Sequence, residues 1–190
     1  MGSFRQLVIE RQNPLCDRYR SRPEDALTVS RARTLAGASL DPFHAAVLAG
    51  GREEVPWRVA APREIGGFDD LPTPSDLLCG ALASCLGTTL RLTAARLDVP
   101  IEDFEVRVSA TQDVRGALGV DPLVPVGLQR IRCRVRWRTR ETMASERAER
   151  VVEAAQRASA IVQTLCRGVQ VDIEVEMPRR GSGDAPRREG

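Results

Sequence analysis

The sequence predicts an α+β fold, because its strand-like segments come in runs and do not alternate one by one with helices. Three strand-like segments come first, and a helix, two more strands, a second helix and a last strand follow. With 190 residues, the chain is long enough for one domain with its own apolar core. A doubly wound fold is excluded, because it needs repeated strand–helix units.

The N-terminal third is expected to hold an arm and three strands. Residues 1–26 are polar and arginine-rich and contain two prolines, which predicts an irregular arm or one short strand. The predicted strands follow at 27–35, 44–50 and 54–60, separated by turns that contain Gly or Pro. Residues 61–75 contain three prolines and two adjacent glycines, which predicts a loop.

A long helix is expected from Ser75 to about Asp98. Thr73 or Ser75 can accept a backbone N–H at its start, and Asp76 places negative charge at the positive end of the helix dipole. No charged residue occurs from residue 77 to residue 90. We therefore expect this helix to be central and buried.

The second half predicts antiparallel sheets that pack on the central helix and on a second helix. Residues 101–114 alternate apolar and polar side chains, as a half-buried strand does, and a second strand follows at 127–139. The second helix is expected from about 144 to 165, and a last alternating strand at 169–177. One domain should therefore cover residues 27–177, and residues 178–190 should form a flexible basic tail.

Charge is distributed unevenly along the chain. All 28 basic residues are arginines, against 26 acidic residues, and the excess of two lies in the last 13 residues. Six arginines occupy alternate positions from Arg130 to Arg140, a pattern that would also suit an anion-binding or nucleic-acid surface. The last strand carries a matching acidic row of Asp172, Glu174 and Glu176, which favours a solvated, charge-paired sheet face.

The five cysteines form no CxxC pair, and the single histidine, His44, has no ligand partner at zinc spacing, so neither a metal nor another cofactor is expected. No signal peptide and no membrane-spanning run is evident, so we expect a cytoplasmic protein with reduced thiols. Cys85 differs from the other cysteines because it lies mid-helix among small residues that leave room for a substrate. Its reactivity requires a nearby cation or hydrogen-bond donor that lowers the pKa of its thiol.

The block APREIGGFDDLPTPSDLLCGALASCLGTTL, with the alternating strand that follows it, resembles the OsmC/Ohr superfamily of osmotically inducible and organic hydroperoxide resistance proteins. The segment AAQRASAIVQTLCRGVQVDIEVE is similar to the end of that family, where a second Cys normally opens a Cys-Pro-x-x-x-x-Leu motif. The resemblance implies an intertwined homodimer with sites at the dimer interface. It also implies a cysteine-based peroxidase that acts on organic hydroperoxides.

By position, the resemblance makes Cys85 the peroxidatic cysteine. It places Ser159 where the second, resolving Cys is expected and Ala160 where its Pro is expected, and a serine cannot form the disulfide. The family also activates its cysteine with an arginine held by an acidic residue. The candidates here are Asp76 for the acidic residue and Arg31, Arg33 and Arg63 for the arginine.

Two functions stay open. The first is a one-cysteine peroxidase whose Cys85 is reduced by a small thiol or a partner protein, with Cys166 as the best remaining resolving thiol. The second is a non-catalytic dimer that binds a small molecule or senses redox state. The expected partners are a second copy, a small hydrophobic peroxide or other small molecule and a thiol reductant, and neither nucleic acid nor a membrane.

Overall fold

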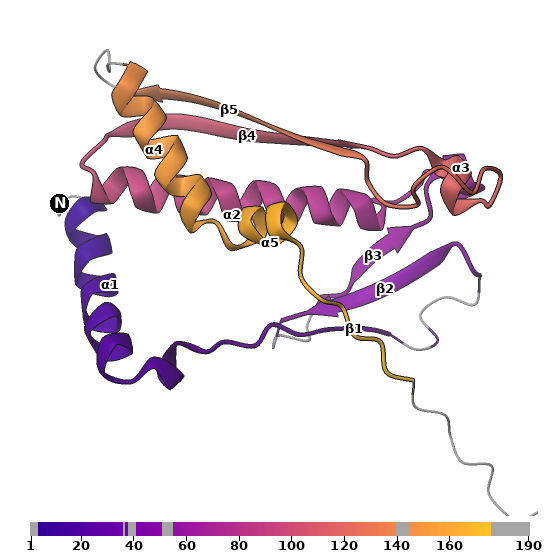
Figure 1. The fold of residues 1–190 in the computed structure, drawn as a ribbon, viewed down its shortest axis with the longest axis horizontal. Helices are drawn as coiled ribbons and strands as arrows, with labels where there is room; N and C mark the ends of the chain where they lie inside the picture. Colours follow the sequence, from indigo (N-terminus) through magenta and orange to yellow (C-terminus); the bar gives the residue numbers. More distant parts are fainter. Residues whose placement is uncertain (1–3, 36, 38–40, 51–54, 140–144, 176–190) are drawn as a thin grey trace, which may run out of the picture.

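The computed structural model describes residues 4–35, 37, 41–50, 55–139 and 145–175. The long helix α2 (Pro74–Arg96) runs between two antiparallel sheets, with α4 (Ser145–Ala158) and α5 (Ala160–Arg167) packed beside it (Figure 1). One sheet has the order β1 (Ala32–Thr34), β2 (His44–Ala49) and β3 (Trp57–Ala60). The other pairs β4 (Ile101–Thr111) with β5 (Arg130–Thr139). The short helices are η1 (Pro23–Ala26), η2 (Arg63–Ile65) and α3 (Val114–Ala117). The α+β fold is confirmed.

The start of α2 follows from its sequence. Thr73 is the N-cap, and its hydroxyl accepts the backbone N–H of Asp76 at 3.2 Å. The Asp76 carboxylate accepts the backbone N–H of Thr73 in return, at 2.8 Å. This reciprocal pair satisfies two backbone donors that a helix end otherwise leaves unpaired. The predicted start is therefore confirmed, with Asp76 engaged in the cap.

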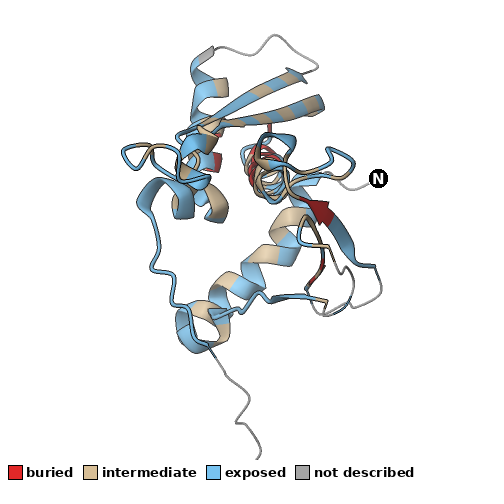
Figure 2. Ribbon diagram, turned by 90° about the vertical axis from the view of Figure 1, so that its right-hand side faces the viewer, coloured by how far each residue is buried: buried red, intermediate tan, exposed pale blue. Residues whose placement is uncertain are grey.

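The core lies along one side of α2. Leu86, Leu90 and Ala94 pack there with Val151 and Ala155 of α4, all nearly inaccessible to solvent. In Figure 2, which views α2 nearly end-on, buried residues occur on the same helix as half-buried and exposed ones. The expectation of a buried helix therefore holds for one face of α2 in the single chain.

By length and composition, α2 is the one helix of the described residues that could cross a membrane, since it has 23 residues and contains an 18-residue window with a mean hydropathy of 1.4. The uncharged run of residues 77–90 is shorter than a membrane-spanning helix and therefore did not indicate this. The core helix of a globular protein has the same composition. In this structure α2 packs against β4, α4, α1 and α5.

The pairing of β4 with β5 places their apolar side chains over α2. Phe104 lies opposite Trp137, Val106 opposite Val135, and Val108 opposite Cys133. Gly87 lets β4 come close to the helix, because a Cβ atom at this position would lie 3.2 Å from the ring of Phe104. This close approach fixes the distance between the central helix and its sheet.

The prediction for the N-terminal arm is wrong over residues 4–21, which form helix α1 (Phe4–Ser21). Arg, Gln, Leu and Glu dominate its first half, and these residues favour helix. Gln6 donates to Glu10 one turn later, at 2.8 Å. α1 then packs against the C-terminal end of α2, where Arg96 donates to Gln12 at 2.7 Å.

Two other expectations fail near the C-terminus. The predicted second helix is interrupted at Ser159, which divides it into α4 and α5. Residues 169–175 pair with no strand of the described chain, and Val169, Val171, Ile173 and Val175 are 64–84% exposed. The side chain of Glu176 and the predicted tail lie outside the described residues.

Asp172 and Glu174 are therefore not neighbours of the arginine row within the described part of the chain. β5 pairs with β4 alone, and Arg138 lies 3.7 Å from Glu102 and 3.9 Å from Asp103 of that strand. Acidic side chains of β4 therefore balance part of the positive charge on β5. Arg140 lies outside the described residues.

His44, for which the sequence predicted no metal-binding role, joins β2 to the loop before α2. Its Nδ1 atom contacts the Asp41 carboxylate, and its Nε2 atom lies 3.1 Å from both oxygens of Asp70. The imidazole also stacks on Phe68, with ring centroids 5.6 Å apart. Hydrogen bonds to Asp41 and then to Asp70 raise the pKa of His44, because both ring nitrogens donate only in the imidazolium form.

The His44 contacts predict a pH-dependent stability. In the unfolded chain the pKa of histidine is about 6.5, so this contribution is complete below that pH. It is lost as the pH rises through the higher pKa of the folded state. Replacing His44→Gln should therefore lower the Tm more at about pH 6 than at about pH 9, by differential scanning calorimetry. An equal Tm difference at both pH values would show that protonated His44 does not stabilise the fold through Asp41 and Asp70.

Candidate functional site

Cys85 lies in the middle of α2, half-buried, next to the apolar strip that contacts α4. Leu82 and Leu86, its buried neighbours on the helix, fix the orientation of this turn. The Thr89 hydroxyl donates to the backbone carbonyl of Cys85 at 2.8 Å. The sulfur therefore sits on a rigid element, at the edge of the core.

Ser159 faces Cys85 from the break between α4 and α5. Its hydroxyl oxygen lies 3.3 Å from the Cys85 sulfur, and its side chain is completely buried. Serine is a favoured N-cap residue, and Ser159 has the extended backbone of an N-cap, with φ −80° and ψ 111°. Its hydroxyl makes no capping hydrogen bond to α5 and is directed to the sulfur instead.

The start of α5 adds backbone donors to this contact. The first hydrogen bond within the helix runs from the Gln163 N–H to the Ser159 carbonyl, at 3.0 Å. The N–H groups of residues 160–162 consequently have no acceptor inside α5. A helix N-terminus also carries partial positive charge, so the position of the sulfur suits an anion.

The pKa of Cys85 reflects both its burial and these donors. Burial raises the pKa of the thiol, but the Ser159 hydroxyl, the backbone N–H groups of Ile161 and Ala160 and the Thr89 side chain together lower it by more. The net pKa lies below the ordinary value for cysteine. Since the thiolate is the nucleophilic form, the arrangement favours a reactive sulfur.

The other predicted site residues do not reach Cys85. The carboxylate of Asp76 is held by Thr73, whose backbone N–H and hydroxyl lower the pKa of Asp76. Arg63 lies exposed in η2, and Arg31 and Arg33 lie exposed at β1. Within the part of the chain that the structure describes, no arginine hydrogen-bonds to the Cys85 sulfur. The structure thus brings Cys85 and Ser159 together and leaves the arginine candidates apart.

The remaining cysteines lie elsewhere, and all five cysteines are free. Burial raises the pKa of Cys79, with a further contribution from the charge of Asp76. The pKa of Cys133 is raised by burial and by the neighbouring Cys79 and Cys166. Cys85 is therefore the cysteine whose surroundings favour the thiolate. The described residues contain no group of three potential ligands that could hold a metal ion.

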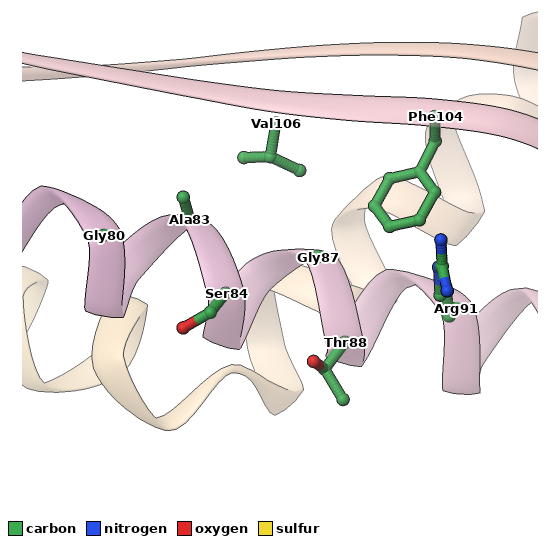
Figure 3. Close-up of a pocket in the computed structure, with 8 residues that line it drawn as sticks. All are labelled: Gly80, Ala83, Ser84, Gly87, Thr88, Arg91, Phe104 and Val106. Atoms are coloured by element: carbon green, nitrogen blue, oxygen red, sulfur yellow. The ribbon is translucent and has the colours of Figure 1, made fainter. Parts of the chain in front are cut away.

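An open depression of about 450 Å³ lies along a different face of α2, beside β4 (Figure 3). Its floor is formed by small helix residues, and its wall by Phe104 and Val106. The Arg91 guanidinium stacks over the Phe104 ring, 4.4 Å from its centroid. Cys85 is not among its lining residues, so this depression is separate from the cysteine site.

Sequence reasoning missed the backbone donors at Ala160 and Ile161. Their signal was the serine followed by the apolar turn Ala160-Ile161-Val162, which is typical of an N-cap and a first helical turn. The continuous apolar periodicity across residues 151–165 concealed the break. The contact between Ser159 and Cys85 spans 74 residues, and its geometry does not follow from local patterns.

These features define an α+β protein with a polarised cysteine on a central helix between two antiparallel sheets. The family model for OsmC-like proteins matches residues 67–174, more than half of the chain. The chain therefore belongs to the OsmC family. No curated protein matches the sequence.

Solved structures show the same fold at low sequence identity. An organic hydroperoxide resistance protein from Elizabethkingia anophelis, solved with thiocyanate bound, is 19% identical, with a TM-score of 0.55 over 75% of this chain and 90% of that chain. An OsmC-like protein from Mycoplasma pneumoniae is 12% identical, with a TM-score of 0.58 over 74% of this chain and 89% of that chain. A putative organic hydroperoxide resistance protein from Vibrio cholerae, with captopril in one active site, is 17% identical, with a TM-score of 0.51 over 77% and 91%.

The site geometry makes a prediction for Ser159→Ala. A hydrogen bond to a charged group contributes about 1.5–3 kcal/mol, so loss of this hydroxyl should slow alkylation of Cys85 by iodoacetamide near pH 7 by about tenfold. The rate is followed by mass spectrometry with fragmentation, which assigns each alkylation to Cys85 or to Cys79 within their shared tryptic peptide. Alkylation of Cys79 in the same sample serves as the control and should be unchanged. An unaltered pH–rate profile for Cys85 would show that Ser159 does not stabilise the thiolate.

Proposed function

We propose that the protein is a thiol peroxidase that reduces organic hydroperoxides through one cysteine, Cys85. The observation that carries this proposal is the Cys85 sulfur at 3.3 Å from the buried Ser159 hydroxyl, at the N-terminus of α5. These donors lower the pKa of the thiol, which is what a peroxidatic cysteine requires. Membership in the OsmC family supports the same activity, since solved relatives include organic hydroperoxide resistance proteins.

In the proposed reaction, the Cys85 thiolate attacks one oxygen of the hydroperoxide, and the O–O bond breaks. The sulfur becomes sulfenic acid, and the leaving alkoxide takes a proton and departs as an alcohol. One external thiol then displaces water to form a mixed disulfide with Cys85. A second external thiol attacks this disulfide and restores the Cys85 thiol.

Ser159 has two roles in this proposal. It takes the position that the sequence resemblance gives to the family's second cysteine, so a disulfide between the two positions cannot form. Its hydroxyl and the adjoining amides of α5 supply the hydrogen bonds that the family obtains from an arginine. Reduction by an external thiol suits a reducing compartment such as the cytoplasm, which the free cysteines also favour.

We also propose that the protein functions as a homodimer. In the single chain, only 28% of the apolar window of α2 is buried, and the alternating apolar row of residues 169–175 is open to solvent. Exposed apolar surface of this extent is typical of a protein–protein interface. An unpaired extended segment also tends to add to the sheet of another chain.

One observation favours a second function, a dimer that binds a small molecule or senses redox state without turnover. No arginine of the described chain hydrogen-bonds to the Cys85 sulfur. The transition state of peroxide cleavage is then stabilised by fewer charges than in a site that contains an arginine. The Vibrio cholerae structure shows that an active site of this fold accommodates a small organic molecule. The peroxidase would reduce peroxide repeatedly, whereas the binding or sensing dimer would not.

The peroxidase proposal predicts a specific loss of thiol. The reduced protein, mixed with cumene hydroperoxide, should lose the Cys85 thiol quickly and should turn over when dithiothreitol is present. Cys85→Ser should abolish both effects, and Cys166→Ser, a matched change of an exposed cysteine in α5, should leave both intact. Thiols are counted with Ellman's reagent, and alcohol is measured by chromatography. Fast oxidation without turnover would favour the sensing function, and no oxidation at excess peroxide would contradict both redox functions.

The dimer proposal predicts a mass twice the 20.8 kDa of one chain in light scattering. The double variant Val171→Asp/Ile173→Asp places charges on the exposed apolar row and should shift the protein toward monomer. Gln170→Asp, which adds one negative charge on the opposite side of the segment, is the control and should stay dimeric. A monomeric wild-type protein at micromolar concentration would contradict the proposal.

A further inference from the structure

We propose that oxidised Cys85 closes on a backbone nitrogen in the first turn of α5, at Ala160 or Ile161, and forms a sulfenamide. The inference rests on the proposed function, because a hydroperoxide must first convert the Cys85 thiol into sulfenic acid. The product is an internal sulfur–nitrogen bond that needs no second cysteine. It gives this chain its own way to protect the oxidised sulfur.

The geometry brings the required groups together. The Ser159 hydroxyl contacts the sulfur at 3.3 Å, and the nitrogen of Ala160 is bonded directly to the carbonyl carbon of Ser159. Since the first hydrogen bond within α5 starts at Gln163, the N–H groups of Ala160 and Ile161 are not used by the helix. Both groups help to lower the pKa of the Cys85 thiol. The amide nitrogens therefore lie beside the contact between Ser159 and the sulfur before oxidation occurs.

The other thiols lie further away. Cys166 follows Ala160 by six residues on α5, which is about 9 Å along a helix with a rise of 1.5 Å per residue. Cys79 precedes Cys85 by the same number of residues on α2, and so by the same distance. Either thiol would need a helix to unwind before it could reach the sulfur. A first-turn amide needs only a local movement of the end of α5, where helices fray first.

The chemistry balances without another reactant. The hydroperoxide oxidises the Cys85 thiolate to sulfenic acid and is itself reduced to an alcohol. The amide nitrogen then attacks the sulfur, the S–O bond breaks, and the hydroxyl leaves as water with the proton of the amide. An external thiol later attacks the sulfur, which breaks the S–N bond, returns the proton to the nitrogen and leaves a mixed disulfide.

Two features of the sequence fit this route. The resemblance to the family places a proline where this chain has Ala160, and a proline has no N–H to lose. Ser159, in turn, replaces the thiol that would otherwise react first. The same short segment thus removes one partner for the sulfenic acid and provides another. A closed sulfenamide also keeps further peroxide from converting the sulfur to sulfinic acid.

The test uses a variant in which Cys16, Cys79, Cys133 and Cys166 are replaced by serine, so that Cys85 is the only thiol. After one equivalent of cumene hydroperoxide, the intact mass should fall by about 2 Da relative to the reduced protein, because addition of oxygen is followed by loss of water. Tryptic digestion without reductant should join the peptide of residues 64–91 to that of residues 158–167. Dithiothreitol should separate the two peptides and restore the original mass.

The single variant Cys166→Ser provides the same readout if the fourfold variant does not fold, because it excludes the disulfide that would join the same two peptides. Ala160→Pro/Ile161→Pro removes both nitrogens as partners and should accumulate the products that are about 16 and 32 Da heavier than the reduced protein. A stable product 16 Da heavier in the single-thiol protein, without the cross-link, would overturn the sulfenamide and leave the peroxidase proposal standing. No mass change would contradict the proposed function itself, and a cross-link to any other residue would overturn the assignment.

Discussion

The contact between Cys85 and Ser159 depends on a break in a helix. A polar thiol at the edge of an apolar core is costly unless it has hydrogen-bond partners. A continuous helix from 145 to 167 would present only side chains to α2, with every backbone N–H used inside the helix. The interruption at Ser159 turns the end of the second segment toward α2 and exposes unused N–H groups to the sulfur. The reactive character of Cys85 is thus a property of the tertiary arrangement.

This arrangement requires that α2 be held firmly on several sides. Its start is closed by the reciprocal contacts of Thr73 and Asp76, and β4 packs closely over Gly87. Val151 and Ala155 of α4 cover the apolar strip. Each contact fixes either the position or the rotation of the helix, and together they determine where the Cys85 sulfur lies. The small residues that make a close approach possible also leave part of α2 uncovered in one chain, which is one of the observations behind the proposed dimer.

Local patterns predicted much of this architecture. The proline, threonine and aspartate at residues 73–76 predicted the start of α2 because capping is a local interaction, and the alternation in 101–111 predicted β4 for the same reason. The segment 169–175 has an equally regular alternation and is not in a sheet. Alternation indicates two different faces, but a strand also needs a neighbour, and the pattern carries no information about which chain supplies it. Contacts between residues far apart in the sequence determine where Ser159 and the arginines lie relative to Cys85. Periodicity within one segment does not encode such contacts.

Within the described residues of one chain, the groups that lower the pKa of Cys85 are hydroxyls and helix amides, and this has a physical consequence. A guanidinium is a full charge on a long side chain and stabilises both the thiolate and the negative charge that develops on the peroxide oxygens. Helix amides and hydroxyls stabilise charge over a short distance and in a fixed direction. In this chain they lower the pKa of the resting thiol. A low pKa alone increases the thiolate fraction but reduces the nucleophilicity of each thiolate. For the proposed peroxidase, stabilisation of the departing alkoxide therefore calls for a further group, and in the proposed dimer the second copy would supply it across the uncovered face of α2.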